Sequence, residues 1–162
     1  MDTYTSLSEL LSPFVAGEGI QDVERLASVL TAVAASTAQS VAYQESLLDR
    51  GALDRYSELV GMKNVRNNRQ AAYSLVQVVT TACRRTTDKS TACPVNSAHL
   101  GKLLSFDDLV QLSAAHPTDV NLAKGICWCL AVLCADNTDT MTKCGESTAP
   151  AEIVRILTAF TN

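Results

Sequence analysis

Three long stretches of the chain carry the same apolar pattern at helical spacing. They read LASVLTAVA, AAYSLVQVV and ICWCLAVLC, and they begin at residues 26, 71 and 126. Apolar residues three and four positions apart line one face of a helix. The three stretches match at their fifth and eighth places, which hold Leu30 and Val33, Leu75 and Val78, and Leu130 and Leu133. A helical pattern that recurs along a chain predicts an array of similar units.

A second, shorter pattern recurs as well. GALDRYSELV, LSFDDLVQLS and TAPAEIVRIL begin at residues 51, 104 and 148 and share apolar residues at their sixth and ninth places. The steps from Leu30 to Leu75 and from Leu75 to Leu130 are 45 and 55 residues long. One insertion of roughly ten residues, in the polar stretch 84–97, explains the difference, because insertions in repeats fall in loops. A period of about 40–47 residues is typical of HEAT and armadillo arrays.

The amino-acid composition and the small number of prolines favour helices along the whole chain. Aromatic residues make up only 5% of the chain, and its four prolines are few for an all-β protein. We therefore expect an all-α chain, with its helices at about residues 7–15, 19–36, 40–51, 52–61, 66–84, 98–105, 106–116, 119–135, 140–147 and 149–160. The helix over 66–84 is apolar nearly all round and should be central.

The two motifs resemble the armadillo family. AAYSLVQVV and ICWCLAVLC are similar to the run A-A-W-A-L-S-N-L-A of that family's longest helix, and GALDRYSELV is similar to the G-A-I-P-x-L-V-x-L-L of its preceding short helix. The resemblance implies a right-handed superhelix of α-hairpins with about three repeats, although a HEAT array stays open. The expected units are a partial repeat at 5–37, repeats at 40–84 and 95–135, and a terminal partial repeat at 138–160.

The resemblance also implies a binding groove. In armadillo arrays the third helix of each repeat lines the concave side, and in the peptide-binding members a Trp and an Asn four residues apart project into it. The matching pairs here are Ser28 with Ala32, Tyr73 with Gln77, and Trp128 with Val132, so every asparagine is replaced. With the cations one turn earlier, the expected groove residues are Arg69, Tyr73, Gln77, Lys124, Trp128 and Val132. The alternative is that Tyr73 and Trp128 pack between helices.

The expected groove is basic and aromatic in its C-terminal half. Such a surface favours an acidic or amphipathic segment of another protein over a basic peptide. The sequence thus predicts a protein–protein interaction module, a scaffold or adaptor without a cofactor. A regulatory subunit that acts like a co-chaperone on an enzyme is the alternative, and a zinc or thiol-redox protein is a further one.

The six cysteines are expected in the core. None forms a C-x-x-C pair, and His99 and His116 lie at no ligand spacing from each other. Cys127 and Cys134 are seven residues apart, so they share a helix face, whereas Cys129 points elsewhere. A buried thiol packs as a small hydrophobe. We expect no metal site and no catalytic constellation, because phosphate-loop and nucleophile-elbow motifs are missing as well.

The net charge and the residues near the two ends of the chain predict the class of partner and the location of the protein. The net charge of −4 disfavours nucleic acid, and no apolar run is long enough for a membrane span. The acidic start MDTYTSLSELLSPFV resembles no secretory signal, which predicts a cytoplasmic location with reduced thiols. The loop 84–97 is either a solvated connection or a regulatory site. Apolar residues at the two ends predict self-association or docking, namely Leu7, Leu10 and Leu11, and Ile153, Ile156, Leu157 and Phe160.

Overall fold

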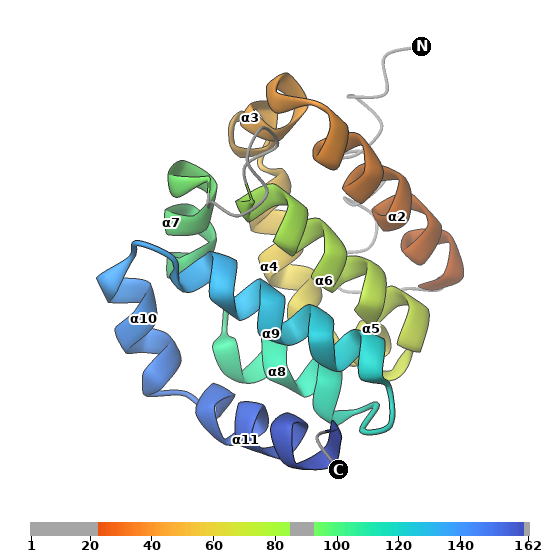
Figure 1. Cartoon of the computed structure of the whole chain (residues 1–162). Coiled ribbons are helices and arrows are strands. Elements are labelled where there is room, and N and C mark those ends of the chain that lie inside the picture. The colour runs from red at the N-terminus through yellow and green to blue at the C-terminus, as the bar shows by residue number, and fades with distance from the viewer. Residues whose placement is uncertain (1–22, 85–92, 161–162) are drawn as a thin grey trace.

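The computed structural model describes residues 23–84 and 93–160 (Figure 1). Within these two ranges the chain forms ten helices and no strand, which confirms the all-α class. No helix there has the length and hydropathy that crossing a bilayer requires. The helices are α2 Val23–Gln39, α3 Val41–Asp49, α4 Ala52–Val60, α5 Lys63–Asn67, α6 Arg69–Cys83, α7 Pro94–Leu103, α8 Phe106–Ala114, α9 Val120–Cys134, α10 Thr138–Gly145 and α11 Ala149–Phe160.

The three longest helices, α2, α6 and α9, lie side by side with α6 in the middle (Figure 1). The helix expected to be central is therefore central. Its buried side chains include Leu75, Val76 and Val79, and α2 adds Leu26 and Leu30. Burying each such side chain stabilises the fold by roughly 1.5–3 kcal/mol. Because α6 contributes to both contacts, it holds the row together.

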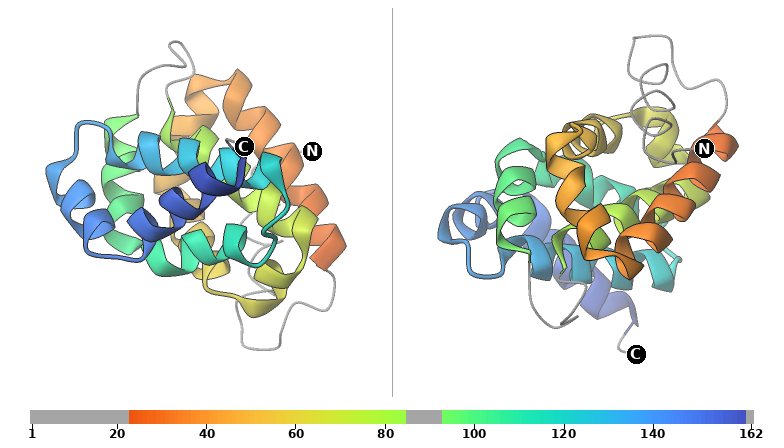
Figure 2. Two further views of the ribbon diagram at one scale, coloured as in Figure 1. Left: turned by 60° about the horizontal axis from the view of Figure 1, so that its bottom comes forward. Right: turned by 90° about the horizontal axis from the view of Figure 1, so that it is seen from above.

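Shorter helices lie behind this row. Contacts join α4 to α6 and α8 to α9, while α11 lies against α8 and α9 at the opposite end of the row from α2 (Figure 2). Along the chain, α3 and α4 precede α6, α7 and α8 precede α9, and α10 and α11 follow. The sequence predicted this order, in which two short helices precede each long one. The short helix α5 was not predicted.

Polar residues fix where the helices begin. The side chains of Ser40, Asn68, Ser105 and Asn137 each accept a hydrogen bond from a backbone N–H in the first turn of the following helix. These bonds satisfy donors that have no partner inside a helix. Gly51 separates α3 from α4 with φ of 65°, a left-handed conformation that glycine adopts at little cost.

The C-terminal end of α6 is held by buried side chains from two other helices. The Gln44 Nε2 of α3 donates to the Thr81 and Ala82 carbonyls at 2.8 and 3.2 Å. The Asn96 Nδ2 of α7 donates to the same Ala82 carbonyl at 2.9 Å and to the Gln44 carbonyl at 3.2 Å. The last carbonyls of a helix need such partners, and leaving one buried without a partner costs about 1–3 kcal/mol.

This network corrects the expected loop over 84–97. Residues 85–92 lie outside the described residues, but α7 begins at Pro94, which occupies a first-turn position where its missing N–H costs nothing. Asn96 and Ser97 looked like loop residues because they are polar. Both are buried, and the Ser97 Oγ lies 3.3 Å from the carbonyl oxygens of Cys83 and Val132.

The structure describes only one of the two ends at which exposed apolar residues were predicted. The expected helix over 7–15, with Leu7, Leu10 and Leu11, and most of the N-terminal part of the first repeat lie outside the described residues. In α11, Ile156 is buried, which corrects the expectation for that residue, and Ile153 and Phe160 are half-buried. Val154 and Leu157 are 62% and 55% exposed. Self-association through this end stays a prediction.

Close packing of α7 on α10 yields a test of the fold. A Cβ on Gly101 would lie 2.9 Å from the Cγ2 of the buried Thr140 and closer still to its Oγ1. Gly101→Ala should therefore lower the free energy of unfolding by about 1–3 kcal/mol. Gly145→Ala, on α10, is the matched control, because its Cβ would meet nothing within 4 Å. Urea unfolding measures both variants.

The double variant Gly101→Ala, Thr140→Ala separates this clash from a general effect of alanine. Removing the Oγ1 and Cγ2 of Thr140 should make the combined loss smaller than the sum of the two single losses. Strict additivity, or equal losses for Gly101→Ala and Gly145→Ala, would contradict the close contact.

Candidate functional site

The outward side of α6 and α9 presents two stripes of exposed or half-exposed side chains. On α6 they recur three or four residues apart, as on one face of a helix, and α9 shows the same spacing. The residue directly after α6 joins them. We call this surface the α6–α9 face: Gln70, Tyr73, Gln77, Thr81 and Arg84, with Asn121, Lys124, Trp128 and Ala131.

Trp128 is the most prominent side chain of the face. It is the only tryptophan of the chain, and 47% of its surface is exposed. The guanidinium carbon of Arg84 lies 5.8 Å from the centroid of the indole ring. At exposed sites such a cation–π contact contributes about 0.5–1 kcal/mol. The structure thus directs Trp128 to solvent and does not bury it between helices.

Tyr73 and Gln77 form the α6 side of the face. Both are half-buried, and Tyr73 packs against the hydrophobic core with part of its ring still accessible. Tyr73 therefore combines the two roles that the sequence left as alternatives. Gln77, one turn later, adds an amide that is able to donate and accept hydrogen bonds.

Arg69 is exposed, but its charge has a partner. Its Nε lies 2.5 Å from the Oδ2 of the buried Asp119. The other oxygen, Oδ1, accepts hydrogen bonds from the backbone N–H groups of Asn121 and Leu122 at 3.0 and 3.1 Å, which begins α9. The expected helix over 119–135 begins at this residue, but the sequence did not predict the ion pair to α6.

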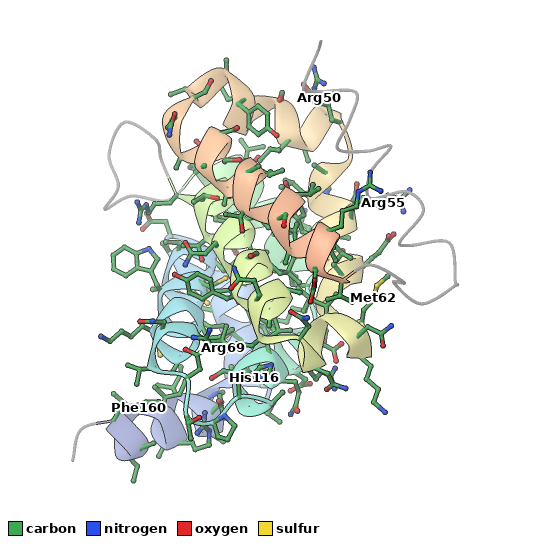
Figure 3. All side chains as sticks on the ribbon, turned by 90° about the vertical axis from the view of Figure 1, so that its right-hand side faces the viewer. Arg50, Arg55, Met62, Arg69, His116 and Phe160 are labelled. Carbon is green, nitrogen blue, oxygen red and sulfur yellow. The ribbon has the colours of Figure 1, made fainter. Side chains whose placement is uncertain are left out.

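Asp119 is held as a carboxylate by these neighbours. Desolvation by itself would raise its pKa, but the N–H of Leu122 and the nearby Arg69 outweigh it, so that the pKa lies below the usual value. Figure 3 shows Arg69 together with His116, which lies between α8 and α9. The Nε2 of His116 is 2.8 Å from the Arg66 carbonyl. The Arg69–Asp119 pair joins the start of α6 to the start of α9, and the His116–Arg66 contact joins the α8–α9 connection to α5.

Val132 does not belong to the face, and its prediction is wrong. The side chain is 7% exposed. The reason is helix geometry: the family pattern places the partner of the aromatic residue four positions later, and four positions turn about 40° beyond a full turn. On α9 that rotation directs Val132 inward, whereas Ala131, three positions after Trp128, stays exposed.

Arg84 is the residue that sequence reasoning missed. Residue 84 is shared by the expected helix over 66–84 and the polar stretch 84–97, and it was not among the expected groove residues. It is half-buried and immediately follows the helix, so its side chain reaches Trp128. The parallel course of α6 and α9 brings them together: Arg69 meets Asp119 near one end, and Arg84 meets Trp128 toward the other.

The spacing of the two helices depends on Gly125. A Cβ at this position would lie 3.2 Å from the Cγ1 of Val76, tighter than ordinary van der Waals contact. Glycine therefore allows α9 to approach α6 closely at the middle of the face. Val76 is fully buried, so the contact belongs to the core beneath Trp128 and Tyr73.

The expectation that the six cysteines lie in the core is confirmed for three of them. Cys129 is buried, together with Cys83 and Cys144, while Cys127 and Cys134 are only half-buried. The prediction of Cys127 and Cys134 as core residues is wrong in that respect, because the buried side of α9 faces α6 and α8. Cys127 lies instead on the side of Glu152 in α11. The described residues contain no group of three or more histidine, cysteine, aspartate or glutamate side chains placed to hold a metal ion.

Asp119 gives a prediction for stability. Asp119→Asn keeps an oxygen that caps α9 but removes the charge beside Arg69. We expect a loss of about 1 kcal/mol in unfolding free energy at neutral pH. Because the folded pKa is lowered, the loss should be full above about pH 4, the usual pKa of aspartate, and should fade as pH falls through the lowered value. Urea unfolding across this range measures it.

Asp49→Asn is the control for that experiment, since Asp49 is exposed at the end of α3. A loss for Asp119→Asn that stays constant down to strongly acidic pH would contradict the role of its carboxylate.

Burial and desolvation predict the order in which the thiols react. Burial raises the pKa of Cys129 to about 12 and that of Cys83 well above its usual value, and it also raises the pKa of Cys127. Iodoacetamide at neutral pH, with mass mapping, should modify Cys127 slowly in native protein and Cys83 and Cys129 only after unfolding. Rapid native labelling of Cys129 would contradict its place in the core.

Comparisons with known proteins assign no family to the chain. No protein-family model, no curated protein and no solved structure matches it. The arrangement of the helices and the chemistry of the α6–α9 face are therefore the observations from which a function is proposed.

Proposed function

We propose that the chain is a protein-interaction module, a short helical array that binds a segment of another protein on the α6–α9 face. The proposal includes the finer architecture expected from the sequence, a right-handed superhelix of armadillo type. Two short helices before a long one, twice over, and long helices packed side by side support that architecture. Repeat arrays of this kind use extended surfaces to bind partners.

The observation that carries the proposal is the exposure of Trp128. A large aromatic side chain is mostly buried in a folded protein, yet this one is nearly half exposed beside Arg84 and Lys124. Tryptophan, tyrosine and arginine dominate the residues that contribute most to protein–protein binding. Trp128, Tyr73 and Arg84 supply all three types on one surface.

The chain also has a surface pocket away from the α6–α9 face. It has a volume of about 390 Å³ and lies between the α7–α8 turn and the end of α10. Its Lys143 donates to the carbonyls of Gly101 and Lys102 at 3.1 and 2.8 Å, and its Asp107 accepts two hydrogen bonds from Thr148. These charged groups hold helix ends in place, so the pocket favours a structural role over catalysis.

Affinity capture followed by mass spectrometry tests the binding face. The bait is the wild-type chain, Trp128→Ala or Tyr73→Ala, with Val95→Ala as the control because Val95 is 61% exposed on α7. We expect one set of partners to be retained by wild type and Val95→Ala and lost from Trp128→Ala, whose truncation should weaken binding by about thirty-fold or more.

Thermal unfolding of each bait establishes that the variants are folded. Tyr73→Ala should also lower the unfolding temperature, since Tyr73 packs against the core, whereas Trp128→Ala should change it little. Identical partner sets for Trp128→Ala and wild type would rule out the α6–α9 face as the binding surface.

A further inference from the structure

We infer that the segment bound on the α6–α9 face is acidic, with an apolar or aromatic side chain next to its carboxylates. This inference rests on the proposed function and adds the chemistry of the partner. It follows from where the charges of the chain lie, from which cations are already paired, and from what surrounds Trp128.

The chain as a whole is acidic, but the two helices of the face are not. Its 17 acidic residues outnumber 13 lysines and arginines, giving the net charge of −4. Yet α6 and α9 contain no aspartate or glutamate. The exposed charges along these two helices are the cations Arg69 and Lys124, with Arg84 directly after α6. The third long helix of the row, α2, carries one acidic residue, Glu24 in its first turn.

Only part of this positive charge is available to a partner. Asp119 neutralises Arg69 across the helix pair, so Arg69 mainly joins α6 to α9. Within residues 23–84 and 93–160 no ion pair involves Lys124 or Arg84. Lys124 precedes Trp128 by one helical turn, about 6 Å along the axis, while Arg84 approaches the ring from α6.

The surroundings of Trp128 define what fits between these cations. Trp128 and the exposed Ala131 offer an apolar surface for one side chain of the partner. Carboxylates on either side of that side chain would reach Lys124 and Arg84. A basic segment would meet like charges at both places. Two available cations on an acidic protein also provide few of the phosphate contacts on which nucleic-acid affinity depends.

Synthetic peptides test the inference directly. The probe is a short peptide that alternates glutamate with leucine, compared with versions in which glutamine or lysine replaces each glutamate, and with a single-stranded oligodeoxynucleotide. Since Trp128 is the only tryptophan, its fluorescence reports binding at the face itself. Titration calorimetry supplies each Kd, so that a change of baseline emission in a variant does not affect the comparison.

We expect the glutamate peptide to shift Trp128 emission saturably and to bind at least about ten-fold more tightly than the glutamine peptide. Raising the salt concentration to about 1 M should remove most of this difference, because it shortens the Debye length to about 3 Å. Lys124→Gln and Arg84→Gln should each weaken binding by about two- to five-fold.

Two controls separate this site from general attraction. Lys63→Gln removes an exposed cation on α5 and should leave the Kd unchanged. Arg69→Gln should lower the stability of the fold but alter the Kd less than Lys124→Gln does, because Arg69 is paired.

Equal binding of the glutamate and glutamine peptides, or tighter binding of the oligonucleotide, would overturn the inference. So would unchanged affinity in both Lys124→Gln and Arg84→Gln. If partners in the capture experiment still depend on Trp128 in that case, the face is a binding surface for a different chemistry and the proposed function stands. If they do not, both fail.

Discussion

The structure depends on the contacts of the central helix α6, which packs against helices on both sides and has hydrogen-bond partners for its last carbonyl groups. Helix α6 buries apolar residues against α2 and α9 at once, and its terminal carbonyls accept hydrogen bonds from Gln44 and Asn96. Gln44 comes from α3, before α6 in the chain, and Asn96 from α7, after it. A single helix end therefore joins α3, which precedes α6 in the chain, to α7, which follows it. Buried amides of this kind have few alternative partners, which fixes the register of the stack.

The sequence predicted the long helices well and the polar details poorly. Apolar periodicity revealed α2, α6 and α9 because their buried faces are wide and regular. Asn96 and Ser97 were misread because polarity alone cannot distinguish a solvated loop from a buried cap. Only the tertiary contact with α6 gives them their role. Proline at position 94 was the local signal that a helix starts there.

The candidate site shows the same division. The family resemblance implied Tyr73, Gln77, Lys124 and Trp128 as groove residues, and all four are exposed or half-buried, because a stripe on a helix is a local property. It could not identify Arg84, whose contact with Trp128 joins residues 44 positions apart. Nor could the sequence pattern reveal that Arg69 forms an ion pair with Asp119. Val132 was misplaced because the family pattern was applied position by position, whereas the rotation of α9 about its axis decides which residue reaches the surface.

The close approach at Gly125 links the core to the α6–α9 face. Arg84 directly follows α6 and Trp128 lies on α9, so their separation depends in part on how near α9 comes to Val76 of α6. The spacing of the side chains on the α6–α9 face therefore depends on the size of the residue at position 125 in the interior. A homologue with a larger residue at position 125 would hold α9 farther from α6. The α6–α9 face would then be wider, and its binding preference would change through a residue that does not contact the ligand.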